Sequence, residues 1–313
     1  MRRARKLLFL VVGLACGTAG MVAQGAEPAD AAGALAVRAV AEQNRVVVLV
    51  GDREFTAYRF GDDLKYPHFY PVNGPLSGQS VTTYNTEPWP HHTSLFLSCD
   101  RVSGSNYWQP FHELKTGQIT ATAPRIVENA GAKVVLSDVA QWAKPGQEPQ
   151  LRDTRTVTIT APSPTVRVLD FQFDFHILQD LLIQKTGHSL FAARMNPALA
   201  VDGGGTLVDA DGNRGEEGTR GKTAAWCACY GPHHGQTEGL AIMQHPANPY
   251  SPAPWFNRNY GFFSPTPVWL EDRELKAGDE FTMRYRVVVF AGNHEEAGLA
   301  GLYAEFEKDA GGR

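Results

Sequence analysis

Apolar and polar residues alternate along much of this chain in short runs that are separated by turn residues. From Leu169 to Phe175 the apolar side chains occupy odd positions and the polar ones even positions, which is typical of a strand with one wet face. Glycines and prolines separate such runs, for example at Gly203-Gly204-Gly205. The pattern predicts strands over 45–50, 54–60, 95–98, 118–127, 133–139, 154–160, 165–175, 191–201, 223–229, 239–244 and 281–290.

Helical spacing of apolar residues appears only near the end of the chain. Within 294–308, Leu299, Leu302, Tyr303 and Phe306 follow a helical period. Many strands and one short C-terminal helix predict an all-β fold, a large antiparallel sandwich or a barrel. We expect one domain over 39–313, preceded by a flexible, Ala-rich leader over 27–38.

The first 26 residues have the order of features of a secretory signal peptide. A short apolar run over 7–15 leads to small residues before Glu27, and four basic residues precede the run, namely Arg2, Arg3, Arg5 and Lys6. The run is too short and too rich in glycine to favour a permanent membrane helix. We therefore expect an exported protein, periplasmic or extracellular, with lipidation at Cys16 as the alternative that would keep it on a membrane.

Charge excludes one class of partner. The chain has 29 basic and 33 acidic residues, and loss of the four basic residues of the signal leaves 25 against 33. A surface with this excess of negative charge and no Lys/Arg stripe repels nucleic acid and anionic lipid. We expect no nucleic-acid partner, and no membrane partner after signal cleavage.

Three cysteines remain after the signal: Cys99, Cys227 and Cys229. Cys227 and Cys229 share one face if they lie on a strand, so a bond between them is disfavoured. A disulfide from Cys99 to either of them is one alternative in an oxidising compartment. Buried free thiols that act as small apolar residues are the other.

Histidine, tryptophan and tyrosine gather in three Pro/Gly-rich segments, which we expect to be loops between strands. The segments are 66–75 with 87–92, then 226–234, and then 245–260. Binding residues are often mounted on such loops. Sugars present flat C–H faces and hydroxyl groups, which proteins bind with aromatic rings and polar side chains. The composition of these segments, which include Trp89, Trp108, Trp226, Trp255 and Tyr260, therefore favours a carbohydrate site.

The same histidines allow a metal site as an alternative. His91-His92 and His233-His234 are consecutive, so only one of each pair could point inward from a strand. A site assembled across the fold from His92, His234 and His245 would be needed to bind a transition metal. We predict no resident cofactor.

Several motifs of these segments resemble a known family. They are Tyr70-Pro71 with Gly74-Pro75, Pro88 to His92, Arg194 within the segment Phe-Ala-Ala-Arg-Met, and Gly239 to Trp255. Together they resemble the secreted bacterial family labelled "methane oxygenase PmoA" over roughly residues 45 to 290. The resemblance implies a galactose mutarotase-like β-sandwich from bacteria that degrade complex glycans. It also implies that matching positions line the site, namely His91, His92, Arg194, His245, Asn248 and Trp255.

We therefore expect a carbohydrate-active protein, with an enzyme (hydrolase, lyase or epimerase) favoured. His92 or His245 would act as general acid or base, and Arg194 would bind a carboxylate or polarise an oxygen. The expected substrate-binding residues are His91, Trp226, Tyr230, His234, Asn248 and Trp255. The alternatives are a non-catalytic glycan-binding module and a metal-dependent enzyme that uses the same histidines.

Overall fold

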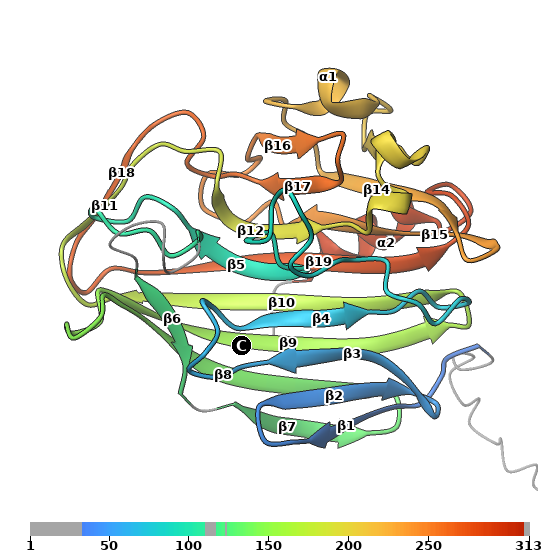
Figure 1. Cartoon of the computed structure of the whole chain (residues 1–313), viewed down its shortest axis with the longest axis horizontal. Helices are drawn as coiled ribbons and strands as arrows, with labels where there is room; N and C mark the ends of the chain where they lie inside the picture. The colour runs from blue at the N-terminus through green and yellow to red at the C-terminus, as the bar shows by residue number, and fades with distance from the viewer. Residues whose placement is uncertain (1–32, 110–116, 123, 310–313) are drawn as a thin grey trace, which may run out of the picture. The chain divides into compact units, whose positions relative to one another are not determined.

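The computed structural model describes residues 33–109, 117–122 and 124–309. The chain divides into two units, Met1–Ala32 and Gly33–Arg313, and all described residues belong to the second. That unit contains two large antiparallel sheets that pack face to face (Figure 1). Among the described helices, none is long and apolar enough to cross a membrane.

The first sheet has eight strands in the order β1-β2-β3-β4-β5-β12-β17-β16. Its strands are β1 (Val37–Ala41), β2 (Arg45–Val50), β3 (Arg53–Arg59), β4 (His68–Val72), β5 (Leu95–Cys99), β12 (Ser189–Arg194), β16 (Trp255–Arg258) and β17 (Phe262–Pro265).

The second sheet has nine strands, in the order β13-β14-β15-β19-β10-β9-β8-β6 with β7 also paired to β8. Its strands are β6 (Gln118–Ala121), β7 (Arg125–Ala130), β8 (Lys133–Ala143), β9 (Leu151–Ser163), β10 (Val166–Ile177), β13 (Thr206–Asp209), β14 (Trp226–His233), β15 (Gln236–Gln244) and β19 (Glu280–Ala291).

A small sheet and four short helical segments complete the described fold. The small sheet pairs β11 with β18. The bounds are β11 (Leu181–Ile183), β18 (Arg273–Leu275), the 3-10 helices η1 (Pro197–Leu199) and η2 (Val201–Gly203), and the α-helices α1 (Gly215–Thr219) and α2 (Leu299–Phe306).

The main core fills the space between the two large sheets. Phe171 of β10 meets Phe69 of β4 edge-on, with ring centroids 5.4 Å apart, and also contacts Phe191 of β12 at 4.8 Å. Period-2 alternation puts these rings on the facing sides of the sheets. The burial of so many large apolar side chains is the main force that holds the sheets together.

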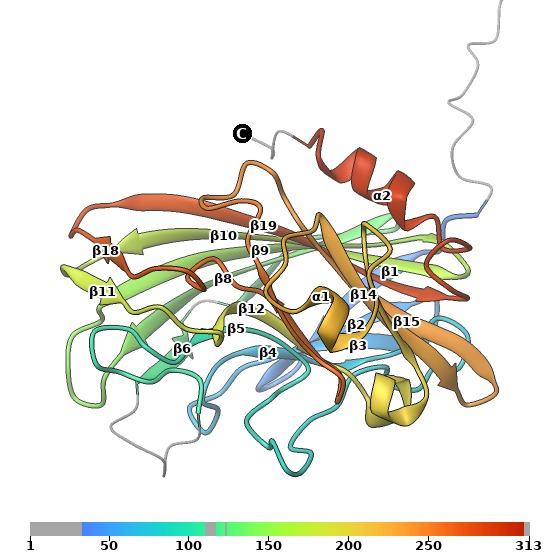
Figure 2. The same cartoon turned by 90° about the horizontal axis from the view of Figure 1, so that it is seen from above.

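A second, smaller core lies on the opposite side of the nine-stranded sheet, under α2. Phe306 of α2 packs there with strand residues that include Trp226, Tyr230 and Met243. Figure 2 shows α2 beyond β10 and β19, on the side away from the eight-stranded sheet. Both faces of the nine-stranded sheet are therefore covered in this region.

The edge strand β1 is joined to β7 of the other sheet by a side chain. The Asn129 side chain accepts a hydrogen bond from the Ala39 N–H at 2.7 Å and donates one to the Ala39 carbonyl at 2.9 Å. The Val37 N–H also donates to the Gly131 carbonyl at 2.7 Å. An amide side chain thus provides the donor and the acceptor that a neighbouring strand would offer.

The predicted all-β antiparallel sandwich with a short C-terminal helix is confirmed. The signal peptide at 1–26 and the first part of the leader lie outside the described residues. The leader's last part is not flexible chain, because β1 begins at Val37 and the Leu35 N–H already donates to the Ala161 carbonyl at 2.8 Å.

Some details of the sequence prediction were wrong. The three Pro/Gly-rich segments are not only loops, since β4, β14 and β16 lie within them. The run at 118–127 divides into β6 and β7, and the run at 191–201 ends as a strand at Arg194.

The cysteine alternatives are resolved. Cys99, Cys227 and Cys229 are free and buried, and burial raises the pKa of the Cys99 and Cys229 thiols to about 12.

Candidate functional site

The candidate site lies on the face of the eight-stranded sheet that points away from the nine-stranded sheet, which we call the outer face. Register places its residues side by side across five neighbouring strands, β4, β5, β12, β17 and β16: His68 faces Phe96, and Arg194 faces Phe262, which in turn faces Arg258. Residues one position along each strand point the other way, into the main core. Figure 2 shows the connection between β4 and β5 on this side, away from β10 and β19.

Aromatic residues from loops cover this face. Tyr260, in the turn between β16 and β17, stacks on the ring of His92 at 6.1 Å and on Trp89 at 5.9 Å. Trp108 meets the His92 ring edge-on at 6.3 Å. Trp89 is 40% exposed, so its ring is available to a ligand in solvent.

His92 is almost fully enclosed by these rings. Only 2% of it is exposed, and its Nδ1 has no hydrogen-bond partner in the part of the chain that the structure describes. Burial lowers the pKa of His92 to about 2, and the neighbouring positive charges of Arg194 and Arg258 contribute. His92 is therefore a neutral imidazole at physiological pH.

Arg194 is a buried cation without a carboxylate partner among the described residues. It is 2% exposed, its Nη1 donates to the Tyr260 carbonyl, and its guanidinium lies 4.7 Å from the centre of the Tyr260 ring. Its Nε is buried without a hydrogen-bond partner in the described chain, and burial lowers the pKa of Arg194. Burying a charge is costly unless an opposite charge compensates it.

The other arginine beside His92 is better compensated. Arg258 pairs with Glu216 at 3.2 Å. Arg194 is thus the cation of this group whose charge is left for a ligand to balance.

A cavity of about 210 Å³ opens beside this cluster. His68, Tyr84, His91 and Trp108 are among its lining residues. His68 Nε2 and Trp108 Nε1 are buried and have no hydrogen-bond partner within the described ranges. Burial lowers the pKa of His68 to about 4, so this ring is also neutral. Two residues that line the cavity therefore carry buried nitrogen atoms whose hydrogen-bonding capacity no described residue satisfies.

Of the predicted site residues, the structure brings His91, His92 and Arg194 together. His91 and His92 have ring centroids 4.5 Å apart, and both Arg194 and His92 contact Tyr260.

Two others, Trp226 and Tyr230, lie on the far side of the molecule, in the core under α2. There the Tyr230 hydroxyl lies 3.0 Å from His294 Nδ1.

Three more of the predicted residues make packing contacts or hydrogen bonds within the fold, away from the outer-face cluster. His245 packs on Phe306 at 5.1 Å and contacts the Asp309 carbonyl. Asn248 binds the backbone of Arg284 through both side-chain atoms. Trp255 is fully buried and donates to the Ala224 carbonyl at 2.9 Å.

His234 has a φ of 48° in the turn between β14 and β15. Among the described residues, no three His, Cys, Asp or Glu side chains are grouped closely enough to hold a metal ion, and this includes His92, His234 and His245.

Sequence reasoning missed His68, Tyr84 and Arg59. The His68 ring stacks on Tyr84 at 5.3 Å, and the Arg59 guanidinium lies 5.3 Å from the same Tyr84 ring. A signal was present, because His68 lies in the aromatic segment at 66–75. The pairing of β3 with β4 that places Arg59 beside it could not be read from the sequence.

Comparison with known proteins gives a family but no activity. Residues 45–304 match the family of unknown function DUF6807, and the chain belongs to this family. No curated protein matches the sequence. Among solved structures, a polysaccharide lyase matches at 13% identity with a TM-score of 0.30, over 84% of this chain and 33% of that protein. The chain thus spans about a third of the length of that lyase.

Proposed function

We propose that this protein binds an acidic sugar or oligosaccharide on the outer face and acts on it by general acid/base chemistry of a histidine. The observation that carries the proposal is the buried cation of Arg194, which makes no ion pair with a described residue and feels only the more distant charge of Asp202. A carboxylate on the ligand would supply the missing opposite charge. We also propose that the protein is exported and that it is related to the secreted bacterial family labelled "methane oxygenase PmoA".

The residues of the face have separate roles in this proposal. Arg194 binds the acidic group, and the exposed ring of Trp89 stacks on a C–H face of the sugar. His68 and Trp108, through their unpaired nitrogens, bind hydroxyl groups in the cavity. His92 contacts Trp108, which lines the cavity, and in this proposal its ring exchanges a proton with the bound sugar.

Binding of an anion also changes the acidity of His92. The positive charges of Arg194 and Arg258 hold the pKa of His92 down, although burial is the larger cause. A carboxylate seated on Arg194 cancels part of that field and raises the pKa of His92 toward the range useful for proton transfer.

A glycan-binding module without catalysis is the second candidate, and the neutral state of His92 favours it. A group with a pKa of about 2 is a poor proton acceptor near neutral pH. In that case His92 serves only as a hydrogen-bonding partner for the ligand.

Two variants and one control test the proposal. Arg194→Met should weaken binding of acidic oligosaccharides by about 10- to 100-fold, because a charge-assisted hydrogen bond is worth about 1.5–3 kcal/mol. His92→Gln should reduce turnover by at least about 100-fold if it transfers a proton. His234→Ala, in the turn between β14 and β15, is the control and should change neither. Isothermal titration and product analysis on matched acidic and neutral glycans give the readouts.

The outcomes separate the candidates. Product formation that His92→Gln abolishes supports the enzyme, and saturable binding without product supports the binding module. Equal affinity of the unmodified protein for acidic and neutral glycans, or unchanged binding in Arg194→Met, would overturn the acidic-sugar proposal.

A further inference from the structure

A second cavity, of about 260 Å³, shares no lining residue with the cavity of the outer face. It is bounded by β2 and β3, by the loop that follows β4, and by the start of β10. Its apolar wall includes Leu35, Val50, Phe55 and Leu76, and two cations, Arg53 and Arg167, also line it.

The two arginines make no ion pair with any described residue. Arg167 is 6% exposed, and its Nη1 donates to the backbone carbonyls of Ser163 and Val166 at 2.7 and 2.9 Å. Arg53 makes one long contact, 3.4 Å from Nη2 to the Ser77 carbonyl. Burial lowers the pKa of Arg167, and the charge of Arg53 lowers it further. Two arginines whose positive charges repel each other therefore line the same cavity.

Two acidic residues lie near this cavity. Glu54 lines it, and Glu54 Oε1 lies 3.7 Å from Arg45 Nη1 and makes no hydrogen bond with a described residue. Glu238 is fully buried behind the loop and accepts hydrogen bonds from the backbone N–H groups of Leu76 and Ser77 at 2.7 and 3.0 Å. The charge of Glu238 offsets only part of that of the arginines, and it does not line the cavity.

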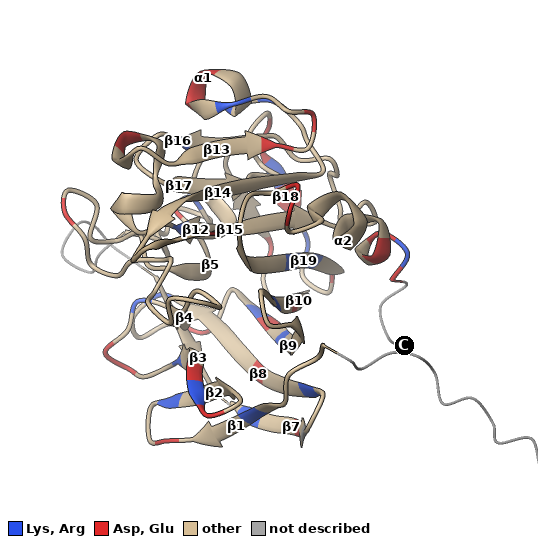
Figure 3. Ribbon diagram, turned by 90° about the vertical axis from the view of Figure 1, so that its right-hand side faces the viewer, with Lys and Arg blue, Asp and Glu red and all other residues tan. Residues whose placement is uncertain are grey.

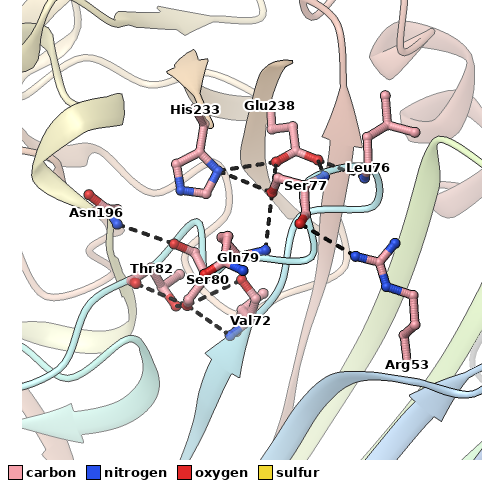
Figure 4. Close-up of polar contacts among 10 residues, drawn as sticks. All are labelled: Arg53, Val72, Leu76, Ser77, Gln79, Ser80, Thr82, Asn196, His233 and Glu238. Atoms are coloured by element: carbon pink, nitrogen blue, oxygen red, sulfur yellow. Dashed lines mark hydrogen bonds and ion pairs between the residues drawn. The ribbon is translucent and has the colours of Figure 1, made fainter. Parts of the chain in front are cut away.

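Buried hydrogen bonds hold the loop wall in place. Figure 4 shows Glu238 between the loop and His233, with Arg53 reaching the same loop from β3. Glu238 Oε2 also accepts from the Ser77 hydroxyl and lies 3.1 Å from His233 Nδ1. Gly78 has a φ of +66°, and a Cβ there would meet Arg53 Nη2 at 2.0 Å. The glycine therefore leaves room for the Arg53 guanidinium beside this loop.

We propose that this cavity binds the carboxylate or sulfate group of a small ligand between Arg53 and Arg167, with the ligand's apolar part on the wall that contains Val50 and Phe55. Arginine suits both oxyanions because its planar N–H groups can donate to two oxygens at once. The site is separate from the outer face and does not depend on the function proposed for that face.

Titration of the full chain with inorganic sulfate, acetate and benzoate, at constant ionic strength in chloride buffer, tests this site. Saturable binding of at least one of these anions is expected, and benzoate should bind more tightly than acetate if the apolar wall contributes. Tighter binding of sulfate than of both carboxylates would indicate that the natural ligand carries a sulfate group.

The matched variants are Arg53→Gln and Arg38→Gln. Both arginines are exposed, on β3 and β1, two strands on which Figure 3 shows basic residues in blue, and Arg38 does not line the cavity. Arg53→Gln should weaken anion binding at least about tenfold, and Arg38→Gln should leave it unchanged. The absence of saturable binding in the unmodified chain, or equal affinity in both variants, would overturn the proposal.

Discussion

Buried polar side chains in this protein fall into two groups that differ in how well they are paired. Between the sheets, Arg155 binds Asp153 through two hydrogen bonds of 2.8 Å, and Asp153 also accepts from the Trp142 indole at 2.7 Å. On the outer face, by contrast, His92 Nδ1 and Arg194 Nε have no partner among the described residues. An unpaired buried polar group costs about 1–3 kcal/mol, and a ligand of the proposed kind would offset that cost on the outer face.

His68 should make stability depend on pH. Its folded pKa is about 4, whereas a histidine in an unfolded chain titrates near pH 6.5. Between these values the unfolded chain binds a proton that the folded chain does not. The stabilisation is therefore complete above pH 6.5 and is lost as the pH falls toward 4. We expect His68 to account for a loss of about 2 kcal/mol in the free energy of unfolding between pH 7 and pH 5.

Urea denaturation at the two pH values measures this loss. His68→Gln should show a smaller loss by about that amount. His234→Gln serves as the control, because His234 is exposed in the turn between β14 and β15 and makes no ion pair with a described residue, and it should retain the full loss. The same pH dependence in both variants would contradict the assignment.

At the scale of elements, α2 protects one face of the nine-stranded sheet. Phe306 is 3% exposed and lies against Arg286, with the guanidinium 5.0 Å from its ring. Arg286 is in turn bound to Asp170 through two hydrogen bonds, of 2.7 and 2.9 Å. The helix is short, so its position depends on this packing more than on its own helical propensity.

Phe306→Ala should lower the free energy of unfolding by about 3 kcal/mol, because it leaves a cavity under the helix. Glu305→Ala, exposed on the same helix, should change it by less than about 0.5 kcal/mol. Sugar binding at the outer face should be equal in the two variants. A loss below about 1 kcal/mol in Phe306→Ala would show that α2 contributes little to the fold.

At the scale of the whole described unit, the candidate site and α2 lie on opposite sides of the sandwich. The candidate site is on the outer face of the eight-stranded sheet, and α2 covers the far face of the nine-stranded sheet. Alternation along β14 correctly predicted that Cys227 and Cys229 share a face, and it is confirmed that they point into the core. Alternation alone could not assign Trp226 to the α2 side or Arg194 to the outer face. That assignment depends on strand order, which places β12 between β5 and β17, and strand order has no local signature.

Composition predicted aromatic and histidine-rich binding segments, and His91, His92 and Arg194 do meet at one place. The same composition also fits a core. Trp255 is a core residue that fills space between the sheets. His245 packs on Phe306 and so supports α2. Only burial and partners distinguish these roles, and both are properties of the folded chain.

The three core thiols give a test of the sandwich as a unit. Burial raises the pKa of Cys99, Cys227 and Cys229, so almost no thiolate is present at neutral pH. We expect all three to resist alkylation by iodoacetamide in the native protein and to react together on unfolding. Mass spectrometry of labelled peptides across a urea series measures this. Labelling of one cysteine well before the others would show that the two sheets separate in parts.

The contact between Asn129 and Ala39 has a consequence for solubility. An unpaired edge strand can recruit a strand from another molecule and so begin aggregation. At β1, the amide of Asn129 occupies the donor and the acceptor of Ala39 that such a recruit would need. One surface residue thereby helps to keep the protein from self-association at high concentration, a property that stability measurements on the dilute chain would not reveal.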